Sequence, residues 1–427
     1  MDKLIITGGE RLLGEIEVDS AKNAYLPILS ACILCGDKIT LRKCPNFVDI
    51  KNMCKILERL GLEVTKEDDT LHIDGSGADK TFIPTKLAKE IRSSIFTLGA
   101  LLGRLKKARV AYPGGCDIGL RPIDLHLKGL RDLGVKIDES HGYINCDAST
   151  MKGSVVHLDY PSVGATENLM MAGVLAKGTT TIINAAKEPE IVDLQNFINA
   201  MGGKVCGAGS SVITIVGVKE LHGCDYTPIP DRIIAGTYLL MGAMTGGEIM
   251  VKNCIPQHFS SLSNKLQKSG CKLKVFNDKI LIESSGRLKS VNFIETMPYP
   301  GFPTDLQAQI LTLQAVSKGS CVIKENLFET RFKFVPELIK MGANIKVNQQ
   351  MAFVNGVKHL YGADVFATDL RGGVALVMAG LCAEGYTTVN NVFHIDRGYD
   401  AIEKNLQKLG AKIKRESEGE WLRKTKF

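Results

Sequence analysis

One cysteine of this chain lies in a segment whose residue types suit acid–base chemistry. Residues 112–122 read YPGGCDIGLRP, so Cys116 follows two glycines, precedes Asp117 and has Arg121 close behind it. A thiol in a glycine-rich loop near cations is in the setting where cysteines become reactive. Most of the other eleven cysteines lie in apolar stretches typical of buried packing. We therefore predict that Cys116 is a functional residue.

A set of cationic side chains points to an anionic ligand. Guanidinium groups bind phosphate and carboxylate with two parallel hydrogen bonds, so several of them together can neutralise a multiply charged substrate. Any single one is more often a solvated surface charge than a ligand, but the set recurs at matched positions of a repeat described below. Its members are Lys22, Arg92, Arg121, Arg331, Arg371 and Arg397.

Two acidic residues stand where helices are expected to begin. Thr304-Asp305 and Thr368-Asp369 each precede an apolar helical stretch, where an acidic side chain can cap the helix or act in a site. Converging helix starts also supply free N–H groups and the positive ends of helix dipoles, which favour anions. His126 and His394 have apolar neighbours and no evident partner, and we do not predict them to be catalytic.

Six copies of one element organise the chain. Gly61, Gly134, Gly202, Gly270, Gly342 and Gly410 each end a helical stretch and precede a strand, roughly 70 residues apart. The pattern predicts six β-α-β-β-α units, in which each glycine adopts a left-handed conformation at a helix end. Thr227-Pro228-Ile229-Pro230 lies near the midpoint and is the predicted hinge between two similar halves. A first strand, residues 4–7, has no helix of its own and could pair with either half.

Composition narrows the class of protein. The 427 residues are 44% hydrophobic and 23% charged, which predicts a globular protein of two or more domains. The net charge of +7 comes from dispersed lysines and arginines, so no nucleic-acid partner is expected. The sequence has neither a secretory signal nor an apolar run of membrane-spanning length, which predicts a cytoplasmic protein without a membrane partner. The twelve cysteines form no disulfide framework, and Cys32-x-x-Cys35 is interpreted as packing rather than a metal site.

The motifs together resemble the UDP-N-acetylglucosamine 1-carboxyvinyltransferase family over essentially the whole chain. The resemblance rests on residues 22–29, 113–126, 162–166, 302–305, 328–332, 368–371 and 394–399. It implies an α/β (α+β) fold of two domains, each an inside-out α/β barrel of three βαβαββ units. The implied domains are residues 20–229, which hold repeats one to three and the Cys116 loop, and residues 1–19 plus 230–427, closing on substrate in the cleft between them.

The resemblance also implies an activity. The enolpyruvyl group of phosphoenolpyruvate would pass to the 3-hydroxyl of UDP-N-acetylglucosamine, with release of phosphate, as the first committed step of peptidoglycan precursor synthesis. The implied catalytic residues are Cys116, Asp305, Lys22 and Arg397. The implied substrate-binding residues are Lys22, Asn23, Arg92, Arg121, Pro122, Ile123, Asp124, Leu125, Ser162, Val163, Gly164, Thr304, Asp305, Leu327, Arg331, Asp369, Arg371 and Arg397. No metal or cofactor, a monomeric state and alkylation of Cys116 by fosfomycin are implied as well.

Some positions depart from the family pattern, and two other functions stay open. Tyr25, Gly372-Gly373 and Tyr160-Pro161 differ from the residues that the family often carries, which leaves the uridine contacts near Tyr160 open. One alternative is a 5-enolpyruvylshikimate-3-phosphate synthase-like transferase, which the Cys116 loop disfavours. The other is a regulator that binds the sugar nucleotide without catalysis, although a binder has no use for an acid–base pair.

Overall fold

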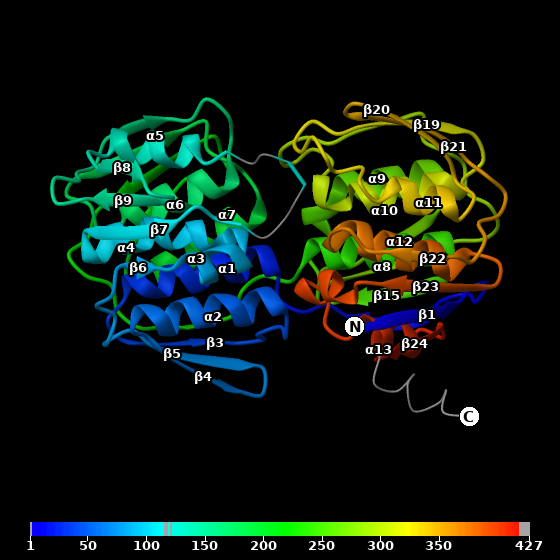
Figure 1. Ribbon diagram of the computed structural model, residues 1–427, viewed down its shortest axis with the longest axis horizontal. Coiled ribbons are helices and arrows are strands. Elements are labelled where there is room, and N and C mark those ends of the chain that lie inside the picture. Colours follow the sequence, from blue (N-terminus) through cyan, green and yellow to red (C-terminus); the bar gives the residue numbers. More distant parts are fainter. Residues whose placement is uncertain (1, 115–117, 120–121, 418–427) are drawn as a thin grey trace. The chain divides into compact units, whose positions relative to one another are not determined.

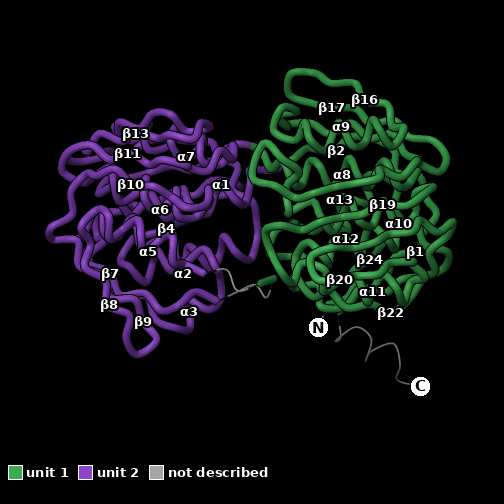
Figure 2. The backbone as a smooth tube through the Cα atoms, turned by 90° about the horizontal axis from the view of Figure 1, so that it is seen from above, with its two compact units in different colours: residues 1–18, 117–120, 230–427 green, residues 19–116, 121–229 purple. Residues whose placement is uncertain are grey.

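The computed structural model describes residues 2–114, 118–119 and 122–417 (Figure 1). Cys116 and Arg121 therefore lie outside the described residues. The chain divides into two compact units (Figure 2). Unit 1 comprises Met1–Val18, Asp117–Leu120 and Pro230–Phe427, and unit 2 comprises Asp19–Cys116 and Arg121–Ile229. Each unit is described by itself below.

A four-stranded sheet is the repeated element of both units. In one example β18 (Phe293–Glu295) runs parallel to β19 (Ser320–Lys324), which pairs antiparallel with β21 (Met351–Asn355), and β21 pairs antiparallel with β20 (Asn344–Asn348). Alternate residues of β19 are buried, as expected of a strand with one face against a core. The described residues form six such sheets, three in each unit.

The other five sheets follow the same order. In unit 2 they are β14 (Asp225–Tyr226), β3 (Lys38–Leu41), β5 (Thr70–Asp74) and β4 (Glu63–Glu67); β6 (Phe82–Ile83), β7 (Lys107–Ala111), β9 (Tyr143–Asp147) and β8 (Lys136–Ser140); and β10 (Val155–His157), β11 (Thr179–Ile183), β13 (Val212–Val216) and β12 (Lys204–Cys206). In unit 1 they are β2 (Leu13–Glu17), β15 (Glu248–Lys252), β17 (Lys279–Glu283) and β16 (Lys272–Val275); and β22 (Asp364–Phe366), β23 (Tyr386–Asn390), β1 (Lys3–Thr7) and β24 (Lys412–Glu416).

A short edge strand links each repeat to the next. β6, β10, β18 and β22 each pair in parallel with the first strand of the following repeat, and β14 returns to pair with β3 of the first repeat. In unit 1, β2 is the edge strand that pairs in parallel with β15. β1 lies between β23 and β24 and pairs antiparallel with both. The N-terminal strand, which the repeat pattern left unassigned, thus completes the sixth repeat.

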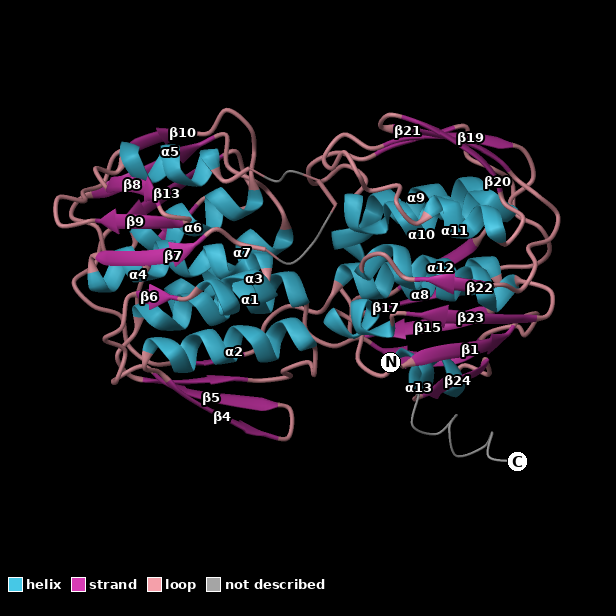
Figure 3. Ribbon diagram, in the orientation of Figure 1, coloured by secondary structure: helices cyan, strands magenta, loops and turns pink. Residues whose placement is uncertain are grey.

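Two sets of helices lie inside the sheets, and Figure 3 shows strands along the outside of each unit. The central set is buried around its circumference and consists of α1 (Lys22–Ala31), α4 (Thr97–Leu105) and α6 (Val163–Gly173) in unit 2, and α8 (Arg232–Met244), α10 (Gln307–Val316) and α12 (Leu370–Cys382) in unit 1. The second set buries one face and consists of α2 (Val48–Leu60), α5 (Asp124–Asp132), α7 (Pro189–Ala200), α9 (Ser260–Ser269), α11 (Val335–Lys340) and α13 (Ile402–Lys408).

The repeat glycines behave as predicted. All six, from Gly61 to Gly410, have φ between 86° and 106°, the left-handed region that glycine enters without a Cβ penalty. The predicted α/β fold of six repeats, with helices inside the strands, is confirmed. The strands of each unit form three separate sheets among the described residues, and the short edge strands are the part that the β-α-β-β-α prediction lacked.

The proline-rich segment at the midpoint is held by unit 2. The Asp193 carboxylate accepts hydrogen bonds from the Tyr226 hydroxyl at 2.6 Å and from the Ile229 N–H at 3.1 Å. The Ile229 carbonyl accepts one from the Ala21 N–H at 2.7 Å. The role of residues 227–230 as a hinge stays a prediction. Among the described residues, no helix is both long and apolar enough to span a membrane.

Candidate functional site

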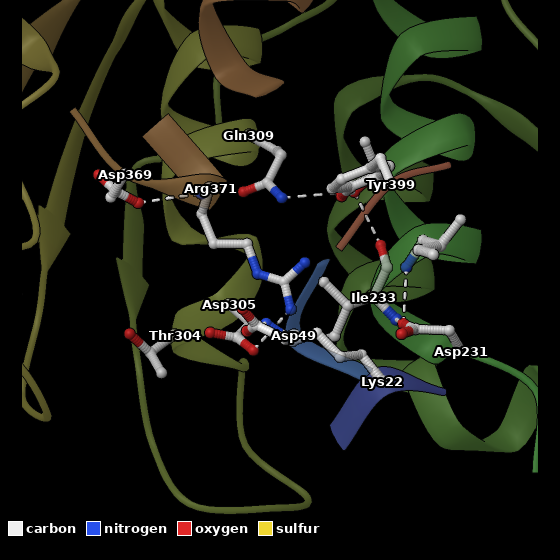
Figure 4. A network of polar contacts seen from close by, with 12 residues as sticks. Lys22, Asp49, Asp231, Ile233, Thr304, Asp305, Gln309, Asp369, Arg371 and Tyr399 are labelled. Carbon is white, nitrogen blue, oxygen red and sulfur yellow. Dashed lines mark hydrogen bonds and ion pairs between the residues drawn. The ribbon is translucent and has the colours of Figure 1, made fainter. Parts of the chain in front are cut away.

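The Asp305 carboxylate is held by two buried arginines in unit 1. Asp305 lies in η4 (Thr304–Leu306), the single turn that leads into α10. Nη2 of Arg331 lies 2.6 Å from its Oδ1, and Nη2 of Arg371 lies 2.9 Å from its Oδ2. Both arginines are 3% exposed, whereas the side chain of Asp305 is 25% exposed. Figure 4 shows the Arg371 guanidinium directed toward Asp305. The Asp305 carboxylate is thus more exposed than the two arginines that hold it.

Electrostatics keeps Arg371 charged. Burial alone would lower the pKa of its guanidinium, but the attraction of Asp305, with smaller contributions from Tyr399 and Asp231, raises it above its ordinary value. A permanent positive charge at the start of α12 adds to the positive end of the helix dipole. Arg371 is therefore a buried positive charge beside the Asp305 carboxylate.

Acidic side chains cap two of the central helices. The Asp369 Oδ1 accepts hydrogen bonds from the N–H groups of Arg371 at 2.9 Å and Gly372 at 3.1 Å, at the start of α12. Asp231 caps α8 in the same way, with Ile233 and Ile234 as donors (Figure 4). Asp369 thus has the capping role that its position allowed, while Thr304 and Asp305 cap no helix. The Asp305 carboxylate thus pairs with arginine side chains and not with the N–H groups of a helix start.

A buried glutamate that sequence reasoning missed supports the same turn. Glu325 is 0% exposed, and its Oε2 accepts a hydrogen bond from the Thr304 hydroxyl at 2.9 Å. Its Oε1 accepts the N–H groups of Leu327 at 2.8 Å and Phe328 at 3.2 Å. Nothing in the sequence distinguishes Glu325 from a surface glutamate except that it directly follows a strand.

Arg397 lies at the end of η5 (Val392–Arg397) and is half-buried. Its neighbour Asp396 is fixed by Arg415 of β24, with Nη1 2.9 Å from Oδ2 and Nη2 2.7 Å from Oδ1. Arg415 also contacts Glu403 at 3.2 Å. Burial, followed by the charge of Arg397, lowers the pKa of His394. That His394 is not catalytic stays a prediction.

A lysine–aspartate pair defines the corresponding region of unit 2. Lys22 begins α1, and its Nζ lies 3.1 Å from Oδ2 of Asp49 in the first turn of α2. The two side chains are 11% and 4% exposed. Asn23 beside it is half-buried. Arg92 begins η2 (Arg92–Phe96) and its Nη1 donates to the Pro113 carbonyl at 3.4 Å, so it contacts the segment that leads to Cys116.

The other predicted residues of unit 2 lie at two helix starts. Ser162 caps α6 by accepting the Ala165 N–H at 3.3 Å, and Val163 and Gly164 form its first turn. A Cβ on Gly164 would lie 2.9 Å from the His126 ring, so that close approach requires glycine. Ile123 precedes α5 and is buried, Pro122 and Asp124 are exposed and Leu125 is half-buried. Leu327 of unit 1 is half-buried as well.

One of the departures from the family pattern, the Gly372-Gly373 pair, has a structural reason. A Cβ on Gly372 would lie 2.8 Å from Cβ of Phe334, and one on Gly373 would lie 2.9 Å from Cβ of Ala367. Tyr25 is fully buried in α1, and Tyr160 is 45% exposed. Close packing therefore accounts for the glycine pair.

Most cysteines among the described residues are in environments that make their thiols unreactive. Burial raises the pKa of ten of them, to about 12 for Cys54, Cys146, Cys321 and Cys382. Cys206 is exposed. The described residues contain no group of His, Cys, Asp and Glu that could hold a metal ion.

Comparison with known proteins agrees with this fold. Residues 6–406 match the EPSP synthase (3-phosphoshikimate 1-carboxyvinyltransferase) family. A solved enolpyruvyl transferase, NikO from Streptomyces tendae, is 25% identical with a TM-score of 0.87, covering 97% of this chain and 98% of its own. EPSP synthase from Acinetobacter baumannii is 17% identical with a TM-score of 0.76, covering 98% and 100%, and shares the fold. The chain belongs to the EPSP synthase family, the enolpyruvyl transferases.

Curated relatives define its position in that family more finely. UDP-N-acetylglucosamine 1-carboxyvinyltransferase 2 of Caldanaerobacter subterraneus is 52% identical over 97% of this chain and 100% of the relative. UDP-N-acetylglucosamine 1-carboxyvinyltransferase of Desulfatibacillum aliphaticivorans is 48% identical over the same shares. The family resemblance that the motifs suggested is confirmed.

Proposed function

We propose that this chain transfers the enolpyruvyl group of phosphoenolpyruvate to the 3-hydroxyl of UDP-N-acetylglucosamine and releases phosphate. The observation that carries the proposal is the half-buried Asp305 carboxylate between buried Arg331 and Arg371, in a chain about half identical to transferases named for this reaction. A carboxylate beside fixed cations can accept a proton while the cations hold a phosphorylated carboxylic acid.

The proposed reaction proceeds by addition and elimination. Asp305 accepts the proton of the sugar 3-hydroxyl as that oxygen bonds to C2 of phosphoenolpyruvate, and Cys116 gives a proton to C3. The product of this step is a tetrahedral phospho-ketal. Loss of a C3 proton and cleavage of the C2–O bond to phosphate then give the enolpyruvyl ether. Atoms balance without a metal or an organic cofactor.

The remaining site residues are proposed by the positions they share with the family motifs. We propose Lys22, Arg92, Arg121, Arg331, Arg371 and Arg397 for the phosphate and carboxylate of phosphoenolpyruvate, and residues 121–125, 162–164 and Leu327 for the sugar nucleotide. Asn23, Thr304 and Asp369 complete the binding set. We propose that domains 20–229 and 1–19 plus 230–427 both supply these residues, and that the reaction begins peptidoglycan precursor synthesis in the cytoplasm.

Phosphate release tests the proposal. The wild-type protein is incubated with phosphoenolpyruvate and either UDP-N-acetylglucosamine or shikimate-3-phosphate, beside Cys116→Ala. Release with the sugar nucleotide alone, lost in Cys116→Ala while sugar-nucleotide binding persists, supports the proposal and the role of the thiol. Release with shikimate-3-phosphate would establish the alternative transferase. Tight sugar-nucleotide binding without release from either acceptor would establish a regulatory binder.

A further inference from the structure

Glu325 is a fully buried carboxylate whose hydrogen bonds reach two parts of the proposed site. It follows β19 directly and is 0% exposed. Its own N–H donates to the Gln350 carbonyl at 2.8 Å, which fixes its backbone to the β20–β21 turn. Its carboxylate accepts hydrogen bonds from three uncharged donors, the Thr304 hydroxyl and the N–H groups of Leu327 and Phe328. A buried carboxylate with these partners holds its donors in place, because leaving a buried acceptor unpaired costs free energy.

One side of this contact leads to Asp305. Thr304 gives its hydroxyl to Glu325, and its carbonyl accepts Nη2 of Arg331 at 3.2 Å. The same Nη2 lies 2.6 Å from Oδ1 of Asp305. Glu325, Thr304, Arg331 and Asp305 thus form a continuous set of hydrogen bonds within unit 1. Neither Thr304 nor Asp305 caps a helix, so this set, with Arg371, fixes the turn that carries the proposed base.

The other side leads to the segment that follows β19. Oε1 of Glu325 holds the N–H groups of Leu327 and Phe328, and the next residues lead to Arg331. The N–H of Asn326 in the same segment donates to the Thr296 hydroxyl at 3.0 Å. Leu327 is the residue of this segment that the proposed function assigns to the sugar nucleotide. The Glu325 carboxylate therefore contacts both the turn that carries Asp305, the proposed base, and the backbone at Leu327, which is proposed to bind the sugar nucleotide.

We propose that Glu325 is a positioning residue of the transfer reaction, holding the Thr304-Asp305 turn and the Leu327-Phe328 backbone in one productive arrangement. This inference rests on the proposed function. Glu325 touches no reacting atom, and its effect passes through Thr304 and Leu327. Misplacing a catalytic group by about 1 Å costs on the order of 100-fold in rate. Loss of one hydrogen bond that leaves a buried partner unpaired costs roughly 5- to 150-fold.

Steady-state phosphate release by Glu325 and Thr304 variants distinguishes the effect on the Thr304-Asp305 turn from the effect on the Leu327-Phe328 backbone. Glu325→Ala frees both segments, so we expect kcat to fall about 100-fold and KM for UDP-N-acetylglucosamine to rise about tenfold. Thr304→Val frees the Asp305 side alone, so kcat should fall about tenfold. Glu325→Gln keeps Oε1 as an acceptor, and its amide can donate to Thr304, so it restores kcat to within about tenfold of wild type.

Two further variants separate positioning from general damage. In the Glu325→Ala background, Thr304→Val should lower kcat by less than about twofold, because the hydroxyl has already lost its partner. Thr312→Val removes another buried hydroxyl of unit 1, which donates to the Ala308 carbonyl within α10, and should leave both kinetic constants unchanged. A Thr312→Val loss as large as that of Thr304→Val would overturn the inference.

The remaining outcomes are decisive as well. Absence of phosphate release by the wild-type protein would remove the proposed function itself. An active wild type with a folded Glu325→Ala variant of unchanged kcat and KM would overturn the positioning role. If Glu325→Ala does not fold, the comparison moves to Glu325→Gln and Thr304→Val, and a Thr304→Val variant with wild-type kcat overturns it instead.

Discussion

Arg371 and Asp305 form an ion pair in which a guanidinium that is 3% exposed lies 2.9 Å from a carboxylate that is 25% exposed. Arg331 occupies the other oxygen of the same carboxylate at 2.6 Å. A substrate hydroxyl must therefore use a remaining lone pair of Asp305, or anionic substrate groups must draw the arginines toward themselves. Either way, we expect the charge of Asp305 to couple to the anionic groups that are proposed to bind the two arginines.

Neutralising Asp305 should affect turnover more than folding. Asp305→Asn keeps the shape of the side chain but loses the charge and most of the ability to accept a proton, so we expect kcat for phosphate release to fall at least about 100-fold. Asp278→Asn, on an exposed turn of unit 1, is the matched control. Sugar-nucleotide binding by calorimetry should persist. A variant that binds normally and turns over within about threefold of wild type would contradict the role of Asp305.

The repeats show how much of the fold a single sequence can predict. The six glycines mark helix ends because left-handed geometry excludes most other residues, so their spacing carries over directly into the structure. The edge strands were missed because β6 and β14 have two residues each, too few to show an alternating pattern. The place of β1 was open to sequence reasoning because its partners, β23 and β24, lie near the other end of the chain.

The site shows the same limit. Lys22, Asp305 and the arginines could be chosen from their types and repeat positions, which are local properties. Glu325 and Asp49 could not, because their importance lies in contacts made only after folding: Glu325 with Thr304 and Asp49 with Lys22. The roles of the chosen residues in the reaction stay predictions. Cys116 and Arg121 lie outside the described residues.

Asp49 should tune the use of phosphoenolpyruvate through Lys22. Asp49→Asn removes the anionic partner 3.1 Å from Nζ, so the ammonium loses the charge of one of the groups that hold it. Because Asp49 is 3% exposed, the ion pair is screened little by water, and we expect kcat/KM for phosphoenolpyruvate to fall about tenfold or more. Asp159→Asn breaks the exposed ion pair with Lys128 in the same unit and should change kcat/KM by less than about twofold. Equal effects of the two variants would contradict this prediction.

Thiol reactivity should single out two cysteines. Burial raises the pKa of ten described cysteines, so they remain protonated at neutral pH, and Cys206 is exposed. We expect iodoacetamide at pH 7.5 to label Cys116 and Cys206 in the folded protein, as read by peptide mass spectrometry. Fosfomycin should label Cys116 and leave Cys206 unmodified. A folded protein in which Cys116 is no more reactive than Cys54 would contradict its proposed role.

Glu167 should make stability fall as pH rises. It is 1% exposed within α6, and neither carboxylate oxygen has a hydrogen-bond partner among the described residues. Burial, followed by the charges of Glu190 and Glu188, raises the pKa of Glu167 well above 4.5. The folded state therefore keeps a proton that the unfolded state releases. The stability from this group is complete below the unfolded pKa and is lost as pH rises through the folded pKa.

The Glu167→Gln side chain does not titrate, so comparing this variant with wild type isolates the contribution of Glu167 to the pH dependence of stability. Urea unfolding at pH 5.5, 6.5 and 7.5 should show the free energy of unfolding of Glu167→Gln gaining on wild type by about 1.4 kcal/mol per pH unit until the folded carboxyl ionises. Glu63→Gln, at an exposed position of β4, should follow the wild-type curve. Parallel curves for wild type and Glu167→Gln would mean that Glu167 is ionised in the folded protein throughout this range, with its charge compensated inside unit 2.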